Sequence, residues 1–372
     1  GHICLDITPV FPNDIGKQSD LRDLLSPGKL IRMDDVDVHT GGAVSNTGLG
    51  MKVLGTDVKL VAKIGSDEFG TIIRRYLEAY HVAQDLIEVS SENTSYSIVL
   101  AIPGIDRIFL HCPGANDTFV WEDIPRQIFD SASLFHFGYP PLMKKQYEDQ
   151  GQELEKIFRN VRDMGIATSL DMAAIDPNSA VAKTPWPYIL KRVLPLVDFF
   201  VPSYEELCFM LDKDHYTELQ KISNGQDITE ILEIERDIRP LAQKCIELGA
   251  RAVLLKCGMY LKTSDCMKNV GGKLELEAKQ WNSFSKFQDS YPIEKVISGS
   301  GAGDTSIAAF LCSVLNGYGP FDSLKHAVVA GALCCMSYDA ISGLKSLTEI
   351  HEMEANNWPV YKKEKINADK FK

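Results

Sequence analysis

The 372-residue sequence predicts an α/β fold in which helices cover both faces of a mostly parallel sheet. Short apolar runs that read as strands alternate along the chain with longer stretches that read as helices. Three of these strand-like runs lie at 134–138, 166–171 and 197–201. Near the C-terminal end, a glycine-rich loop separates a β-prone pair at 296–297 from an apolar, helix-like run at 306–315. Alternation of this kind is typical of a doubly wound parallel sheet.

Composition and charge exclude several classes of function. The formal net charge is −12, from 39 basic and 51 acidic residues, and no basic cluster stands out, so we expect no nucleic-acid partner. The sequence holds no apolar run of about 18 residues, so we expect no membrane span. The nine cysteines form no C-x-x-C pair and the eight histidines no H-E-x-x-H pattern, which argues against a disulfide framework and against zinc. We therefore expect a protein of a reducing compartment, the cytoplasm.

The loop at 298–304 is the strongest candidate for chemistry. A helix that starts here exposes unpaired backbone N–H groups and the positive end of its dipole, which favour a bound anion. Gly301, Ala302 and Gly303 provide those groups, and the glycines let them converge. Asp304 would gain nothing in a loop that only binds an anion, but it could accept a proton from an attacking hydroxyl. The loop therefore predicts phosphoryl transfer, with the backbone as an anion hole and Asp304 as the general base.

Three other interpretations of this loop differ in how well they fit. A dinucleotide fingerprint requires G-x-G-x-x-G, whereas Gly299, Gly301 and Gly303 stand at every second position. A Walker A loop ends in G-K-[ST], which this chain lacks. A plain glycine-rich turn, in which Asp304 caps the helix, stays open because aspartate is a favoured cap.

Two further stretches combine polar groups with a permissive backbone. Gly41 and Gly42 form a turn that enters a helix, and they allow a ligand to approach the backbone closely. Asn46 follows in the first helical turn and offers both a donor and an acceptor. Asp6 stands at the end of a strand, where α/β sheets bind ligands, and could accept two hydrogen bonds from sugar hydroxyls. A tight turn with a polar cap and a surface aspartate are the alternative interpretations.

Gly-Ala-Gly-Asp at 301–304 resembles the second signature of the ribokinase-like, or PfkB, carbohydrate kinases. G-G-x-x-x-N at 41–46 resembles the first signature of that family, and the order and separation of the two match as well. The resemblance spans nearly the whole chain, from Gly1 to about Leu347. It implies one ribokinase-like kinase domain over 1–372, built as a three-layer α/β/α doubly wound sheet with a small β-sheet lid.

The implied lid comprises two segments, at about 8–40 and 93–116. The second segment holds a hairpin pattern, since apolar residues fill both faces of 95–102 before a return strand at 107–111. Strands that are apolar on both faces suit a sheet that covers the substrate or pairs with another lid in a homodimer. The family also has an apolar strand just ahead of the first residue, so the resemblance implies that this sequence starts within that strand.

On the acceptor side, the resemblance assigns substrate contacts to Asp6, Gly41, Gly42, Asn46 and Arg107. Asp6 matches an aspartate that grips substrate hydroxyls, and Arg107 matches an arginine that follows the lid turn in many relatives. A solvated hairpin charge is an equal alternative for Arg107. The acceptor implied is a small sugar that gives the proton of a primary hydroxyl to the general base.

On the nucleotide side, the family motif N-x-x-E matches at Ser203 and Glu206, with serine in place of asparagine. The glutamate of that motif holds magnesium through water, so the resemblance assigns Glu206 to Mg²⁺ and Ser203 to the nucleotide. Lys256 and Gly258 resemble the family's nucleotide-side K-x-G-x-x-G, but Leu261 stands where the second glycine is usual. An ordinary acid in a first helical turn is the alternative for Glu206.

The function implied is transfer of the γ-phosphoryl group of ATP to a sugar hydroxyl, with Mg²⁺ as cofactor and a monovalent cation allowed near the anion loop. Two alternatives stay open. A nucleoside kinase on the same fold would use the base on a ribose hydroxyl, and an aromatic pair would stack its nucleobase. A catalytically impaired relative that binds a sugar or nucleotide is kept open by Ser203, Leu261 and Ser298. The intact Asp304 argues against that second alternative.

Overall fold

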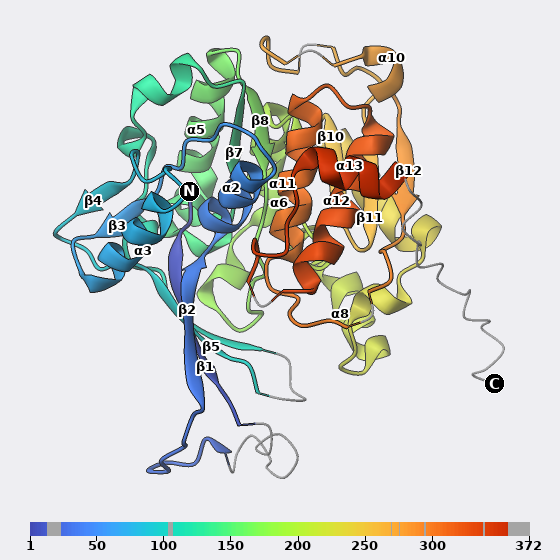
Figure 1. Ribbon diagram of the computed structural model, residues 1–372. Coiled ribbons are helices and arrows are strands. Elements are labelled where there is room, and N and C mark those ends of the chain that lie inside the picture. The colour runs from blue at the N-terminus through green and yellow to red at the C-terminus, as the bar shows by residue number, and fades with distance from the viewer. Residues whose placement is uncertain are drawn as a thin grey trace, which may run out of the picture.

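The computed structural model describes residues 1–12, 24–102, 107–268, 270–274, 276–293, 295–337 and 339–355. Its centre is a six-stranded sheet in the order β12-β11-β10-β9-β8-β7 (Figure 1). Strands β7 to β10 are parallel neighbours, and β11 and β12 extend the sheet in antiparallel pairs. The bounds are β7 (Leu134–Phe137), β8 (Ala167–Leu170), β9 (Phe199–Phe200), β10 (Ala252–Lys256), β11 (Met259–Thr263) and β12 (Ser285–Gln288). The predicted mostly parallel sheet is confirmed.

Helices cover both faces of this sheet and form a core on each (Figure 1). Burial alternates along the strands, since Phe199 and Leu254 face one core whereas Phe200 and Leu255 face the other. One core is built with α2 (Ala43–Val53), α11 (Ala302–Leu315), α12 (Pro320–Cys335) and α13 (Leu347–Ala355). The other is built with α5 (Gln152–Asp163), α6 (Trp186–Val193), α7 (Tyr204–Leu211), α8 (Lys213–Ser223) and α9 (Arg239–Glu247). In the part of the chain that is described, no helix could cross a membrane.

A second, four-stranded sheet projects from the body in the order β2-β1-β5-β6 (Figure 1). Its strands are β1 (Cys4–Val10), β2 (Asp35–Gly41), β5 (Tyr96–Leu100) and β6 (Ile108–Cys112). The two predicted lid segments therefore meet in one sheet, although β1 starts ahead of residue 8, and residues 13–23 lie outside the described residues. Helix α3 (Glu68–Glu78) packs against β1 and β2, and β3 (Lys63–Gly65) pairs with β4 (Ile87–Val89). Short helices α4 (Lys144–Tyr147) and α10 (Ala278–Trp281) lie in connections.

Two local predictions were wrong. The β-prone pair Val296 and Ile297 forms no strand, because both side chains are exposed and the backbone of Ile297 bonds to the end of α12, at Cys335, instead of a neighbouring strand. Asp6 is the third residue of β1 and not a strand end, because the pairing of β1 with β2 continues to Val10.

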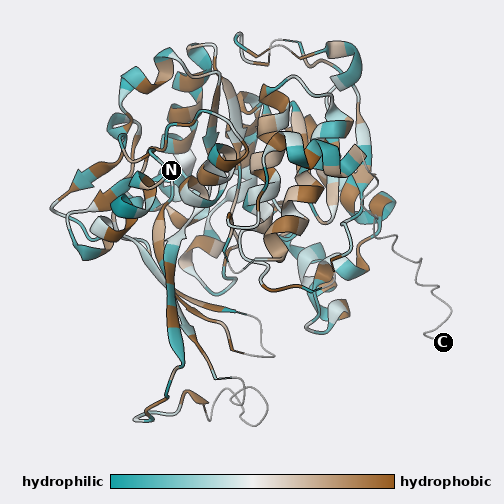
Figure 2. Ribbon diagram, viewed as in Figure 1, coloured by the Kyte–Doolittle hydropathy of each residue, from teal (hydrophilic) through white to brown (hydrophobic). Residues whose placement is uncertain are grey.

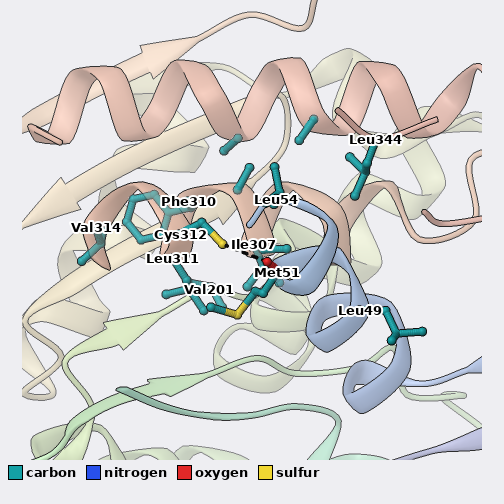
Figure 3. Packing of buried hydrophobic residues seen from close by; sticks show 14 of the residues in the cluster. Leu49, Met51, Leu54, Val201, Ile307, Phe310, Leu311, Cys312, Val314 and Leu344 are labelled. Carbon is teal, nitrogen blue, oxygen red and sulfur yellow. Dashed lines mark hydrogen bonds between the residues drawn. The ribbon is translucent and has the colours of Figure 1, made fainter. Parts of the chain in front are cut away.

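Helices α2 and α11 pack closely and bring two distant stretches of the sequence together (Figure 3). A Cβ atom at Gly50 would lie 3.0 Å from the Cβ of Ala308, so glycine allows this close approach. Further along both helices, the thiol of Cys312 lies 3.8 Å from the carbonyl oxygen of Met51, and nearer their starts Thr47 of α2 hydrogen-bonds to Asp304 of α11. The two helices therefore run in the same direction, and the turn that precedes α2 lies beside the glycine loop that precedes α11.

Candidate active site

The first turns of α2 and α11 meet at the carboxylate of Asp304, which is 5% exposed. The side-chain amide of Asn46 donates to Oδ2 of Asp304 at 3.1 Å. The hydroxyl of Thr47 donates to Oδ1 at 3.2 Å. The structure thus brings together the two glycine motifs that the sequence singles out. Thr47 lies outside the G-G-x-x-x-N motif, and the packing of α2 against α11 brings its hydroxyl to Asp304.

A third donor to this carboxylate, Tyr139, was missed by the sequence analysis. Its hydroxyl lies 2.7 Å from Oδ2 and 2.8 Å from Oδ1 of Asp304. Burial, and next the charge of Asp304, raise the pKa of Tyr139 well above its ordinary value, so the phenol keeps its proton and donates it. The available signal was position, because Tyr139 directly follows the strand-like run 134–138, at the sheet edge where α/β folds bind ligands.

The glycine loop ends in a backbone cap. Gly301 is the N-cap of α11 with a φ of 78°, and a Cβ atom there would lie 2.4 Å from the Cβ of Ala340. The described residues supply no side-chain cap at this end, and Asp304 is the third residue of the helix, so the interpretation of Asp304 as a helix cap is wrong. The helix itself offers no acceptor to the N–H groups of its first turn, Ala302 and Gly303, and that of Ala302 makes a long contact of 3.4 Å with the carbonyl oxygen of Gly299. Such a terminus suits an anion.

A buried ion pair lies beside this loop. Lys256, the last residue of β10, places its Nζ 2.7 Å from Oδ1 of Asp171, which follows β8 and is fully buried. A Cβ atom at Gly303 would lie 3.7 Å from Lys256 Nζ, so the ammonium reaches the first turn of α11. Burial raises the pKa of Asp171 above its ordinary range, against the lowering effect of Lys256. The second oxygen of Asp171, Oδ2, has no hydrogen-bond partner within the described residues.

Ser203 and Glu206 cap the start of α7 reciprocally. Ser203 Oγ accepts the backbone N–H of Glu206 at 3.2 Å, and Glu206 Oε2 accepts the backbone N–H of Ser203 at 2.8 Å. The serine that departs from the family motif thus has a capping role. Ser203 also forms a parallel bridge with Lys256, so the start of α7 lies beside the ion pair. Gly258 lies in the hairpin turn after β10, where a Cβ atom would come within 2.8 Å of Phe287.

Asp6, Gly41 and Gly42 lie where the four-stranded sheet of β1, β2, β5 and β6 joins the rest of the molecule. A Cβ atom at Gly41 would lie 2.0 Å from Asp6 Oδ2, so this position requires glycine while Asp6 keeps its place. Burial raises the pKa of Asp6, and the thiol of Cys4 donates to its Oδ1 at 3.2 Å. Gly42 is the N-cap of α2. The turn at Gly41 and Gly42 therefore links the carboxylate of Asp6 to the helix that carries Asn46.

Two histidines connect Asp6 with Tyr139. The hydroxyl of Ser97 donates to the thiol of Cys4, the donor to Asp6, and its Oγ lies 3.0 Å from Nδ1 of His111. Nε2 of His111 lies 3.4 Å from Nε2 of His2, whose ring centroid lies 5.8 Å from that of Tyr139. Burial lowers the pKa of both histidines, so both rings are neutral at neutral pH. The sequence analysis did not single them out, because isolated histidines form no motif.

Arg107 reaches from the lid sheet to the glycine loop. Its guanidinium donates a hydrogen bond to Ser300 Oγ. A Cβ atom at Gly299 would lie 3.9 Å from the same guanidinium. This contact argues against a solvated hairpin charge and places the Arg107 guanidinium beside the glycine loop.

A cavity of about 460 Å³ adjoins the site through Thr47 and Gly138, which both line it. It runs between the segments 55–61 and 131–136, beneath one side of α2. Neither Asp304, Asp6 nor Lys256 lines it. Its size alone gives no reason to assign it to catalysis.

Comparisons with known proteins show which family and which fold this chain resembles. The family model described as "pfkB family carbohydrate kinase" matches residues 14–347. A curated relative, the 2-dehydro-3-deoxygluconokinase of Thermoproteus tenax, is 23% identical over 314 residues, which cover 83% of this chain and 83% of the relative. The solved structure of Arabidopsis thaliana ribokinase complexed with ribose and ATP has a TM-score of 0.67 and 19% identity, and the match covers 95% of this chain and 96% of that one. A putative ribokinase II from E. coli in complex with ATP and Mg²⁺ has a TM-score of 0.65 and 20% identity, with 96% and 97% covered.

Proposed function

This chain belongs to the pfkB family of carbohydrate kinases, and we propose that it transfers the γ-phosphoryl group of ATP to a hydroxyl group of a small sugar. The observation that carries the proposal is the position of the Asp304 carboxylate at the start of α11. Asn46 and Thr47 of α2 and Tyr139, which follows β7, donate hydrogen bonds to it. A carboxylate fixed beside an anion-binding helix terminus combines a proton acceptor with a phosphoryl site.

Asp304 acts as the general base in this proposal. It accepts the proton of the acceptor hydroxyl while the hydroxyl oxygen forms a bond to the γ-phosphorus. The bond between the γ-phosphorus and the bridging oxygen of ADP breaks in the same in-line transfer. A loose transition state demands little deprotonation beforehand, so the base need not be strong.

The first turn of α11 would hold the transferring phosphoryl group. The N–H groups of Gly301, Ala302 and Gly303 provide donors at the positive end of the helix dipole. Lys256 adds a full positive charge next to them. Although burial lowers its pKa, Asp171 and neighbouring carboxylates raise it by more, so the ammonium stays charged. These groups together support stabilisation of the charge on the phosphoryl oxygens.

Asp171 and Glu206 are the residues that would hold Mg²⁺. Oδ2 of Asp171 is buried without a hydrogen-bond partner within the described residues, and the helix cap engages Oε2 of Glu206. The described part of the chain has no group of three or more acidic, histidine or cysteine side chains suited to a metal, so water and phosphate oxygens would complete the ligand set, as Mg²⁺ commonly requires. Bound Mg²⁺ would offset charge on the β- and γ-phosphates. The monovalent cation and the cytoplasmic location stay predictions.

The acceptor would bind between Asp6 and Asp304. Asp6 would accept hydrogen bonds from hydroxyls that do not react, and the turn at Gly41 and Gly42 keeps the space beside it open. Asn46 fixes the carboxylate of Asp304 from the same turn. The names of the relatives, a 2-dehydro-3-deoxygluconokinase and a ribokinase complexed with ribose, support a small sugar as acceptor.

An ADP-release assay with ATP and Mg²⁺ tests this proposal across ribose, fructose, 2-dehydro-3-deoxygluconate, adenosine, inosine and cytidine. We expect turnover with a sugar, and a loss of about 10²–10⁴-fold in Asp304→Asn, the range of general-base catalysis. Asp322→Asn, in the first turn of α12, is the matched control and should keep wild-type turnover. Near-normal turnover in Asp304→Asn would contradict the assignment. Turnover of a nucleoside would favour a nucleoside kinase, and binding without turnover would favour a binding protein.

We also propose that the four-stranded sheet pairs with that of a second copy. Val36, Val38, Phe109 and Leu110 on its strands are 51%, 40%, 55% and 51% exposed. Figure 2 shows apolar segments along these projecting strands. A second sheet would cover them, as exposed apolar patches often mark an interface. Sedimentation of the wild type should give a dimer that Phe109→Asp weakens, and a monomer in both would contradict the proposal.

The single domain over 1–372 stays a prediction.

A further inference from the structure

The hydroxyl of Tyr139 lies across the open side of the Asp304 carboxylate. Its distances to the two carboxylate oxygens, 2.7 and 2.8 Å, are nearly equal, so the phenol oxygen lies close to the midline between them. Asn46 already donates to one of these oxygens and Thr47 to the other. A phenol has one proton, so it bonds to one oxygen at a time and blocks access to both.

An acceptor hydroxyl needs a place on the same carboxylate. To transfer its proton it must come within about 2.6–3.2 Å of a carboxylate oxygen. A carboxylate has about four lone-pair positions, and Asn46, Thr47 and Tyr139 already use three of them or share them. Of these three donors, only the phenol can be withdrawn by rotation about its side-chain bonds. Asn46 and Thr47 are short side chains fixed on α2.

The backbone holds Tyr139 in this place at the expense of local strain. Its φ of 65° is left-handed, which is unusual for a residue with a bulky side chain. On one side, a Cβ atom at Gly138 would come within 2.2 Å of the Cβ of Ala43 at the start of α2, so this stretch is pressed against the helix. On the other side, Pro140 is buried and continues into a short turn. Strain that the surroundings maintain next to a reacting group points to a functional role.

We propose that Tyr139 occupies the acceptor's place on Asp304 whenever no acceptor is bound, and so prevents the base from activating water against ATP. The inference rests on the proposed function, in which Asp304 is the general base. If water held that place, its oxygen would bond to the γ-phosphorus and its proton would pass to Asp304. The bond to the bridging oxygen of ADP would break, which hydrolyses ATP without product. A sugar displaces the Tyr139 hydroxyl from Asp304 because its other hydroxyls also bind in the site. Water has no such additional contacts.

Tyr139→Phe is the decisive variant, since it keeps the ring and vacates the place on the carboxylate. We expect ATP hydrolysis without acceptor to rise about 10-fold or more, because water can now reach the base. The KM of the acceptor should fall by about 10-fold, because a hydrogen bond to a charged group no longer has to be displaced, while kcat changes little. Tyr188→Phe, on the exposed side of α6, is the matched control and should leave both quantities unchanged.

Two further variants separate this role from a structural one. Tyr139→Leu vacates the place in a second way and should repeat the rise. Adding Asp304→Asn to Tyr139→Phe should return hydrolysis to background, because the base is lost.

The outcomes distinguish this inference from the proposed function. If Tyr139→Phe and Tyr139→Leu both hydrolyse ATP at the wild-type rate, or if the rise persists when Asp304→Asn is added to Tyr139→Phe, Tyr139 is not a placeholder for the acceptor. If Asp304→Asn still phosphorylates the sugar, the general base itself is misassigned. A rise in hydrolysis that depends on Asp304, together with a lower KM, supports both.

Discussion

Removing the ammonium of Lys256 tests the buried ion pair beside the glycine loop. In Lys256→Met, Asp171 loses the partner that lies 2.7 Å away, while its side chain stays fully buried. A buried carboxylate without a partner takes up a proton instead of keeping its charge. Burial already raises the pKa of Asp171, and loss of the cation that lowers it will raise this pKa further.

With Asp171 taken as the ionised partner of Lys256 in the wild type, the free energy of that protonation sets the loss of stability in the variant. In the unfolded chain an aspartate has a pKa of about 3.9, which is about 3 units below pH 7. At about 1.4 kcal/mol per unit, keeping Asp171 protonated at pH 7 costs about 4 kcal/mol. This agrees with the roughly 3–5 kcal/mol that follows when one partner of a buried pair is removed. At pH 5 the same cost is about 1.5 kcal/mol. Because the folded variant binds a proton that the unfolded chain releases, its stability deficit should shrink as the pH falls.

Urea unfolding at pH 7 and pH 5, with linear extrapolation to water, measures both quantities. Lys145→Met is the control, since Lys145 pairs with Glu148 on the surface and its loss should cost at most about 1 kcal/mol. Asp171→Asn combined with Lys256→Met should recover most of the stability, because a neutral amide needs no counter-charge, while kinase activity stays low. A deficit below about 1 kcal/mol at pH 7, or one that is the same at both pH values, would refute this reasoning.

Three further perturbations test other parts of the molecule. Glu206→Gln keeps the reciprocal cap with Ser203, so the melting temperature should hold while the Mg²⁺ concentration for half-maximal activity rises about 10-fold. Gly41→Ala puts a methyl group 2.0 Å from Asp6 Oδ2, so the KM of the acceptor should rise about 10-fold in steady-state assays, and an unchanged KM would contradict the site. Burial lowers the pKa of His326 from 6.5 to about 4, so the unfolded chain binds a proton that the folded chain excludes. Stability from this group should fall by about 3 kcal/mol as the pH drops from 6.5 to 4, and His326→Gln should lack that part of the slope in urea titrations.

The parts of the site that could be predicted are those in which one local stretch carries the whole signal. A glycine turn followed by a polar residue in the first helical turn marks both Asn46 and Asp304, whatever the rest of the chain does. The alternation of strands and helices likewise predicts the central sheet, since burial on both faces leaves continuous apolar runs such as 166–171.

The rest depends on contacts between distant segments. Tyr139 meets Asp304 because β7 ends where α2 and α11 begin, and no local pattern in the sequence encodes that meeting. Asp171 and Lys256 form a pair because β8 and β10 flank β9, which is a property of strand order and not of either strand. The strand expected at Val296 failed for the same reason, since a β-prone pair needs a neighbour to form a strand.

The hydrogen bond between Asn46 and Asp304 joins residues 258 positions apart in the chain. During synthesis, at about 5–20 residues per second, the second partner therefore follows the first by about 13–50 s. On the proposed function, the polypeptide on the ribosome would not consume ATP during that time, because it has the amide but no carboxylate to meet it. The same separation makes the site a late event in folding, because ends this far apart must close a long loop before they gain any contact. A shortened chain that ends before α11 would be inert toward ATP, however well its first half folds.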